Sequence, residues 1–241
     1  MLQGPPQTAK NHLLAALPSE AYERLQPHLE PTTFALGQVV YEPGGSMRYV
    51  YFPTTSHISL LYTMIDGSTA EMGLVGNEGV VGISLFMGGE TTPNRAMVQG
   101  GGGAFRMNAK SMLDEFQRGD EFQHLLLRYT QALITQISQT AVCNRLHSVE
   151  QRLCRWLLMT HDRTESDELQ MTHEFISNML GVRREGVTLA ARRLQEAKMI
   201  SYVRGHINIL NRQQLLAHVC ECYQVVKGEH ERLLGHTSSA Q

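Results

Sequence analysis

The fold of the C-terminal half is decided by one stretch of sequence, Met171-Thr172-His173-Glu174-Phe175-Ile176-Ser177-Asn178-Met179-Leu180-Gly181-Val182-Arg183-Arg184-Glu185-Gly186-Val187. Thr172 is a typical helix N-cap, and apolar residues follow at helical spacing as far as Leu180. Gly181 suits the left-handed conformation that ends many helices. A second helix begins at Arg183 or Arg184, after a short turn. Two helices joined by a glycine-bearing turn are typical of a helix-turn-helix.

The second helix of this motif, which we place at 183–197, has an inward and an outward face. The inward residues repeat at i, i+3, i+4 and i+7 and are Val187, Ala190, Ala191 and Leu194. The N-terminal residues of such a helix enter the major groove of DNA, where Arg pairs with guanine and Glu accepts from cytosine. The side chains predicted to read bases are Arg184, Glu185, Thr188 and Leu189.

A small hairpin is predicted after this helix, with strands at 200–203 and 206–209. Such a wing can place Arg204 and His206 near phosphates. Two arginines of the preceding helix are also expected to contact the DNA backbone, and they are Arg183 and Arg193.

The charge of this region differs from that of the whole chain. Residues 171–212 contain seven basic and three acidic side chains, whereas the 241-residue chain has a formal charge of −2. A compact positive segment is the charge distribution of a DNA-binding module. The spacing alone also fits an ordinary helical hairpin with solvated charges.

A long helix is predicted before the motif, because 120–144 contains neither Pro nor Gly. Its apolar residues form two stripes, one with Phe122, Leu126, Tyr129 and Leu133, the other with Leu127, Ile134, Ile137 and Ala141. Two stripes indicate burial on two sides. Either the helix packs on its own domain and pairs with a second copy of the chain, or it is a single helix buried in a monomer.

The first 110 residues have a different composition, with 15 of the 21 glycines and short runs of β-branched and aromatic residues. Short strands with frequent turn residues predict an antiparallel barrel or sandwich. Asp66-Gly67 predicts a two-residue hairpin turn of type I′, which needs positive φ at both residues. The run Gly100–Gly103 lacks the Lys-Ser/Thr of a phosphate-binding loop and is interpreted as a loose hairpin or bulge.

The helix-turn-helix stretch resembles the winged helix of the Crp/Fnr superfamily of bacterial transcription regulators. The G-x-x-R-E-x-V core of that motif is present as Gly181, Arg184, Glu185 and Val187. The resemblance implies that Arg184 and Glu185 read base edges. It also implies that Thr172 and His173 touch the DNA backbone. Leu189 stands where the cyclic-AMP receptor protein has another base-reading Arg, so the operator is expected to differ.

The N-terminal half is similar to the cyclic-nucleotide-binding β-roll of the same family, on the pieces Leu36–Tyr41, Tyr49–Phe52, Asn77–Gly82 and Asn94–Ala96. The resemblance implies an α+β protein with an antiparallel, jelly-roll-like β-roll, a long dimerisation helix and a C-terminal winged helix-turn-helix. The expected domain limits are 13–118, 119–145 and 146–235. The implied partners are double-stranded DNA with a two-fold symmetric operator, a second copy of the chain, and RNA polymerase.

The residues that match the family's nucleotide pocket are incomplete. Nucleotide-binding members use a Gly, a Glu for the ribose hydroxyl and an Arg-Ser pair for the phosphate. The matching residues here are Gly82, Ile83, Ser84, Arg95 and Ala96. Loss of the carboxylate removes roughly 1.5–3 kcal/mol, a tenfold or greater loss of affinity. Cyclic AMP is therefore not expected to bind in the usual way. Arg95 is either an anion-binding residue or a charge on the rim of the roll.

The four cysteines lie in the second half of the chain and are Cys143, Cys154, Cys220 and Cys222. Fnr-type members hold an iron–sulfur cluster with N-terminal cysteines, so no such cluster is expected here. If 218–222 is helical, Cys220 and Cys222 lie about 200° apart and cannot share a metal. The sequence thus predicts no metal site and no firm cofactor.

Other classes of protein fit the sequence less well. An enzyme on a cupin-like barrel needs His and Glu ligands in its strands, and the roll offers His57 and little else, so no enzymatic activity is expected. No apolar run approaches the roughly 20 residues of a membrane-spanning helix, and a cytoplasmic protein is expected. The alternative to a DNA-binding regulator is a ligand-sensing β-roll protein whose winged helix binds other proteins.

Overall fold

The computed structural model describes residues 10–164 and 166–235. They form two compact units. The first contains the chain up to Leu60, the segment Leu74–Ile134 and the chain from Gly228. The second contains Leu61–Gly73 and Thr135–Lys227. Helices and sheets occur together, so the predicted α+β class is confirmed. The domain limits at 118/119 and 145/146 stay a prediction.

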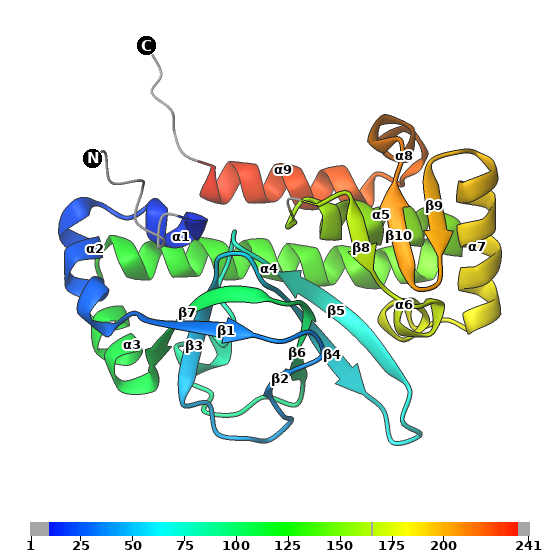
Figure 1. Ribbon diagram of the computed structural model, residues 1–241. Coiled ribbons are helices and arrows are strands. Elements are labelled where there is room, and N and C mark those ends of the chain that lie inside the picture. The colour runs from blue at the N-terminus through cyan, green and yellow to red at the C-terminus, as the bar shows by residue number, and fades with distance from the viewer. Residues whose placement is uncertain (1–9, 165, 236–241) are drawn as a thin grey trace, which may run out of the picture. The chain divides into compact units, whose positions relative to one another are not determined.

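Two sheets lie mostly in the first unit, although the segment Leu61–Gly73 of the second sheet belongs to the second unit (Figure 1). One has the order β1-β7-β3, with β1 at Glu30–Phe34, β7 at Gly102–Asn108 and β3 at Tyr49–Pro53. The other has the order β2-β6-β4-β5, with β2 at Val39–Tyr41, β6 at Arg95–Gly100, β4 at His57–Thr63 and β5 at Thr69–Val75. The pairs β1–β7, β3–β7 and β2–β6 are antiparallel, as predicted.

Side chains of these strands make up the core; burial alternates along the first part of β3 and β6, whereas the first five residues of β4 are all buried. Fully buried examples are Val50, Phe52, Ile58, Val98 and Met107. Short helices accompany the sheets, and they are α1 (His12–Ala15), α2 (Ser19–Leu25), α3 (Ala109–Phe116) and the 3-10 turns η2 (Gln26–His28) and η3 (Ile83–Leu85).

The glycine run at Gly100–Gly103 carries the chain from one sheet to the other. The structure differs from the predicted hairpin or bulge, because β6 ends at Gly100 in one sheet and β7 begins at Gly102 in the other. A Cβ atom on Gly100 would lie 2.0 Å from the His57 ring, and one on Gly102 would lie 2.7 Å from the Thr55 backbone. Only glycine permits this close approach.

The turn between β4 and β5 also differs from its prediction. The Gly67 amide donates to the Met64 carbonyl at 3.0 Å, and Gly67 has φ of +83°. Asp66 has no positive φ, so the two-residue type I′ turn is wrong. Its carboxylate instead accepts from the Ser68 amide at 3.0 Å. A longer turn with one left-handed glycine closes the hairpin, as in type I turns followed by a bulge.

The predicted long helix is present as α4, Glu121–Leu146. Its first stripe is buried, with Phe122, Leu126, Tyr129 and Leu133 almost inaccessible to solvent. On its second stripe, Leu127 is 48% exposed, Ile134 is 52% exposed, and Ala141 is exposed while Ile137 is half-buried. The chain alone therefore covers one of the two apolar stripes.

The second unit contains the predicted helix-turn-helix and wing. Its helices are the end of α4, then α5 (Val149–His161), α6 (His173–Leu180), α7 (Arg184–Glu196), α8 (Arg212–His218) and the start of α9 (Cys222–Leu234). A three-stranded antiparallel sheet has the order β8-β10-β9, with β8 at Glu168–Gln170, β10 at His206–Ile209 and β9 at Ile200–Val203. No helix among the described residues is long and apolar enough to span a membrane.

Candidate nucleic-acid interface

The first helix of the motif begins and ends as its sequence predicts. Thr172 is the N-cap of α6, and its hydroxyl accepts from the Phe175 amide at 3.1 Å. Gly181 follows the helix with φ of +60°, and its amide donates to the Ser177 carbonyl. A left-handed residue here turns the chain sharply, so that α7 can begin three residues later.

The second helix, α7, presents a polar and partly apolar face to solvent. It spans Arg184–Glu196 with Arg183 as its N-cap, one residue shorter at each end than predicted. The predicted inward residues Val187, Ala190, Ala191 and Leu194 are all buried. The four predicted base-reading residues Arg184, Glu185, Thr188 and Leu189 are all exposed. Leu189 is 52% exposed, which is unusual for leucine and leaves an apolar group where a thymine methyl could pack.

His173 connects the two helices and the wing. Its Nδ1 lies 3.1 Å from the Thr188 hydroxyl, which donates to the Arg184 carbonyl at 3.0 Å. The His173 ring also stacks on Tyr202 of β9, with centroids 4.0 Å apart. Burial, and then the charge of Arg184, lowers the pKa of His173 below its ordinary value. These contacts hold the His173 ring between α7 and β9.

The wing has a tight turn that holds one arginine in solvent. Arg204 and Gly205 have φ of +48° and +87°, the pattern of a type I′ turn. Arg204 is exposed at the tip. His206 differs, because its Nδ1 lies 2.6 Å from a carboxylate oxygen of Glu168 on β8. The predicted wing is thus present, but one of its two predicted phosphate contacts already has an acidic partner.

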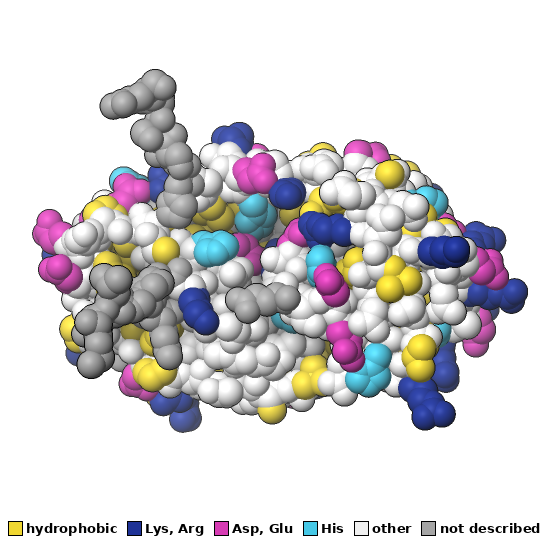
Figure 2. Space-filling view, turned by 45° about the horizontal axis from the view of Figure 1, so that its top comes forward, with side chains coloured by type: hydrophobic (Ala, Val, Ile, Leu, Met, Phe, Trp, Pro, Cys, Tyr) yellow, Lys and Arg dark blue, Asp and Glu magenta, His cyan; other side chains and the backbone are white. Residues whose placement is uncertain are grey.

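The arginines around α7 fall into two groups. Arg193 lies 3.3 Å from Glu150, which also pairs with His218, and Arg192 pairs with Glu196 at 2.8 Å. By contrast, the part of the chain that the structure describes offers no ion pair to Arg183, Arg184 or Arg204. Figure 2 shows Lys and Arg side chains gathered at the right of the view, where α7 lies. Because no described carboxylate neutralises them, these three arginines can donate to phosphates or to base edges.

The residues that match a nucleotide pocket lie in the first unit. Gly82 has φ of +105° and precedes η3, which contains Ile83 and Ser84. Ala96 is fully buried on β6 and offers no hydroxyl to a ligand. The Arg95 guanidinium lies 2.7 Å from the Glu42 carboxylate. The one remaining phosphate-type cation is thus neutralised by a carboxylate, which favours the interpretation of Arg95 as a rim charge.

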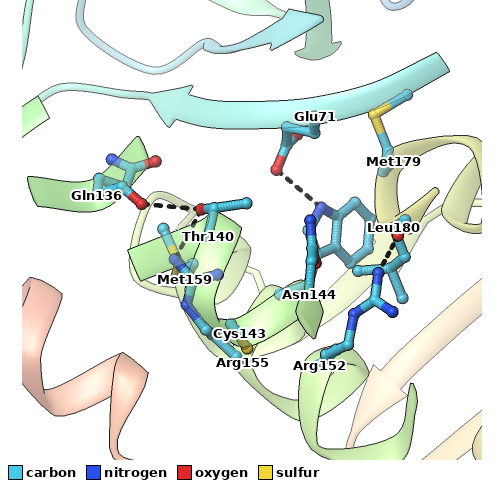
Figure 3. A pocket seen from close by; sticks show the side chains of 11 residues that line it. Glu71, Gln136, Thr140, Cys143, Asn144, Arg152, Arg155, Met159, Met179 and Leu180 are labelled. Atoms are coloured by element: carbon cyan, nitrogen blue, oxygen red, sulfur yellow. Dashed lines mark hydrogen bonds between the residues drawn. The ribbon is translucent and has the colours of Figure 1, made fainter. Parts of the chain in front are cut away.

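The sequence did not predict a buried polar pocket in the second unit, shown in Figure 3. The Trp156 indole donates to the Glu71 carboxylate at 3.1 Å, and Arg155 donates to the Thr140 hydroxyl at 3.0 Å. Arg152 donates to the Leu180 carbonyl. Arg152 and Arg155 are nine-tenths or more buried. Their i, i+3 spacing resembles that of a solvated helix face, so the sequence carries no signal of this burial.

A second group missed by the sequence is formed by Cys143, His147, Cys220 and Cys222. Their ligand atoms lie within 4.8 Å of one another. The argument that Cys220 and Cys222 lie on opposite sides of a helix is wrong, because α8 ends at His218 and α9 begins at Cys222. The intervening residues are not helical, and this break turns both sulfur atoms toward α4.

Comparison with known proteins agrees with this geometry. Residues 151–218 match the family model of the Crp-like helix-turn-helix domain. The chain carries a Crp-like helix-turn-helix domain. Over these residues the match agrees with the resemblance of the helix-turn-helix stretch to the Crp/Fnr superfamily. No curated protein matches the sequence.

Several solved structures have a fold similar to that of this chain, over the Crp-like domain and much of the rest. FixK2 from Bradyrhizobium japonicum has a TM-score of 0.67 and 17% identity, over 80% of this chain and 98% of its own. A CRP-family transcriptional regulator from Thermus thermophilus has a TM-score of 0.66 and 16% identity, over 78% and 95%. The c-di-GMP-responsive regulator CLP from Xanthomonas campestris has a TM-score of 0.63 and 14% identity, over 80% and 99%. At such identities the likeness concerns the fold.

Proposed function

We propose that this protein is a sequence-specific DNA-binding transcription regulator that acts as a homodimer. The observation that carries the proposal is the exposed N-terminal face of α7. It combines two cations without ion pairs, Arg183 and Arg184, with a carboxylate, Glu185, and an exposed apolar side chain, Leu189. This set matches the chemistry of base edges in the major groove.

In this proposal α7 lies in the major groove and reads bases with Arg184, Glu185 and Leu189. Arg184 pairs with guanine O6 and N7, and Leu189 packs against a thymine methyl. Thr188 has a smaller part, because its hydroxyl already bonds to the Arg184 carbonyl and to His173. Arg183 and Arg204 contact phosphates, which set the register but carry no sequence information.

The exposed stripe of α4 supports the homodimer. Leu127, Ile134 and Ala141 recur every seven residues, which is the spacing of a two-helix seam. All three are exposed in the single chain. A second copy of the same helix is the occupant that such a repeat fits. Two recognition helices then contact half-sites separated by about 34–36 Å, one turn of DNA or a multiple of it.

The β-roll in this proposal does not bind cyclic AMP in the usual way. Ile83 and Ala96 replace two of the family's polar contacts, and Arg95 already pairs with Glu42. The protein therefore binds DNA without added nucleotide, or it responds to a ligand of different chemistry.

A second candidate function is a winged helix that binds other proteins. The exposed apolar side chains Leu189 and Val203, 52% and 63% exposed, favour it, because such groups also occur in protein interfaces. The uncompensated arginines beside them favour DNA instead.

Selection of random duplex DNA by the purified chain, without nucleotide, tests the proposal. We expect enrichment of a two-fold symmetric site. If no duplex is enriched, with or without cyclic nucleotides, while the protein captures a defined protein partner through α7, the second candidate replaces the first.

A further inference from the structure

Four metal-ligating side chains meet at one point in the second unit. Cys143 lies on the last part of α4, and His147 directly follows α4, with its amide donating to the Cys143 carbonyl at 3.1 Å. Cys220 and Cys222 lie where the chain passes from α8 into α9. One ligand atom of each residue lies within 4.8 Å of the other three. The three cysteines are buried, and the His147 side chain is 15% exposed. The group is therefore compact and almost closed to solvent.

Two of the distances between these atoms match those of ligands around one ion, and all of them are at most 4.8 Å. The sulfur atoms of Cys143 and Cys220 are 3.6 Å apart, and the Cys222 sulfur is 3.5 Å from Nδ1 of His147. Tetrahedral zinc, with Zn–S of about 2.3 Å and Zn–N of about 2.0 Å, separates two sulfurs by about 3.8 Å and a sulfur from a nitrogen by about 3.5 Å. A disulfide needs an S–S bond of about 2.05 Å, so the sulfur atoms are not bonded to each other.

A carboxylate also lies beside the second ring nitrogen of His147. Its Nε2 lies 3.3 Å from a carboxylate oxygen of Glu221. A carboxylate at this nitrogen keeps it protonated, which leaves the Nδ1 lone pair for a metal. Glu221 lies between Cys220 and Cys222, so one short connection supplies two thiolates and the carboxylate that orients the histidine.

The surroundings of the group compensate the charge that such a site carries. One divalent ion with three thiolates and a neutral imidazole has a net charge of −1. Arg155 lines the same buried pocket as Cys143, and both are drawn in Figure 3. Arg155 is buried, and the described residues contain no carboxylate paired with it. Glu71 lines this pocket too, and its carboxylate accepts from the Trp156 indole. A negative metal–thiolate centre beside Cys143 adds to the negative charge that stabilises the buried guanidinium.

We propose that Cys143, His147, Cys220 and Cys222 bind one Zn²⁺ ion in a tetrahedral Cys₃His site. Four protein ligands leave no open position, which is typical of a structural rather than a catalytic zinc. The ion joins the C-terminal half of α4 to the start of α9. This site is separate from the DNA-reading face of α7, and neither depends on the other for its assignment.

The first test uses the unaltered full-length chain, purified under reducing, oxygen-free conditions. We expect one Zn²⁺ per chain, and X-ray absorption should report three sulfur ligands and one nitrogen. Replacement by Co²⁺ should give the absorption of a tetrahedral thiolate complex. A chain that stays zinc-free after incubation with Zn²⁺, or that binds it only through oxygen and nitrogen ligands, overturns the proposal. So does a metal-free chain in which Cys143 and Cys220 form a disulfide.

Variants then assign the ligands. Cys143→Ala, Cys220→Ala and Cys222→Ala should each lose the stoichiometric ion, and Glu221→Gln should bind it about 10–100-fold more weakly. Cys154→Ala is the matched control, because Cys154 is a buried cysteine outside the group, on α5. Retention of full zinc content by Cys220→Ala or Cys222→Ala, or loss in Cys154→Ala alone, contradicts the assignment. The spectrum of the unaltered chain decides the case if a variant fails to fold.

Discussion

Two arginines that the family resemblance singles out have different surroundings. Arg184 stands at the N-terminus of α7, exposed, and the described residues give it no ion pair. Arg95 stands on the edge of the roll and is held 2.7 Å from Glu42. One cation is available to a ligand, whereas the other is already neutralised. The contrast agrees with the proposal that Arg184 reads DNA and that the β-roll does not bind cyclic AMP in the usual way.

In the proposed homodimer two recognition helices act together, so loss of the dimer should have the largest effect on DNA binding. Ile134→Asp places a charge in the centre of the exposed stripe of α4. We expect a monomer in sedimentation experiments and a loss of about 10²–10⁴ in affinity for a symmetric operator, because the second half-site no longer adds avidity. Met87→Asp is the control, since Met87 is similarly exposed but lies outside α4. A dimeric Ile134→Asp variant would contradict the proposed seam.

A smaller effect is expected at the wing. Arg204→Ala removes a charge placed for a phosphate, so binding should weaken about equally on all DNA sequences. The slope of log affinity against log salt should fall by about one. Arg118→Ala, in the first unit and paired with Glu115, should leave the slope unchanged. A change in sequence preference in Arg204→Ala would place this residue at a base edge instead.

Nucleotide binding should show almost no effect in the unaltered chain. We expect cyclic AMP to produce no saturable binding in calorimetry and no change in DNA affinity. Ile83→Glu combined with Ala96→Ser restores the family's polar contacts, and it should raise the affinity for cyclic AMP tenfold or more over Ala96→Ser alone. Tight binding of cyclic AMP by the unaltered chain would remove the contrast between the two arginines.

The smallest expected effect concerns pH. Burial, and then Arg184, lowers the pKa of His173. Between the lowered pKa of the folded chain and the ordinary His pKa of about 6.5, the unfolded chain therefore binds a proton at His173 more readily than the folded chain does. The contribution of His173 to the free energy of unfolding is complete above this pH range and is lost as the pH falls through it. In denaturant titrations, the free energy of unfolding should decrease less steeply with falling pH in His173→Gln than in the unaltered chain. An equal decrease in both would exclude His173 as its source.

The local parts of the fold could be predicted from the sequence. The caps at Thr172 and Gly181 and the inward face of α7 follow from residues three or four positions apart, as does the buried stripe of α4. The exposure of Arg184 and Arg204 follows from the same periodicities. Such features are set by neighbours along the chain, and the sequence displays those neighbours directly.

The remaining features depend on contacts between distant residues. Cys143 and Cys220 are 77 positions apart, and their meeting requires a break between α8 and α9 that no Gly or Pro marks. The pairing of Arg95 with Glu42 joins residues 53 positions apart. The change of sheet at Gly101 depends on how close His57 and Thr55 approach. A sequence pattern therefore cannot predict these contacts.

The specificity ratio of Arg184→Ala tests the central claim most directly. On the selected site and on a scrambled duplex of equal length, Kd is measured for the unaltered chain, for Arg184→Ala and for Arg183→Ala. We predict that Arg184→Ala loses about 1–3 kcal/mol on the selected site only, so that its ratio falls. Arg183→Ala should weaken both duplexes alike and keep the ratio. An unchanged ratio in Arg184→Ala would contradict the assignment of α7 as the helix that reads DNA.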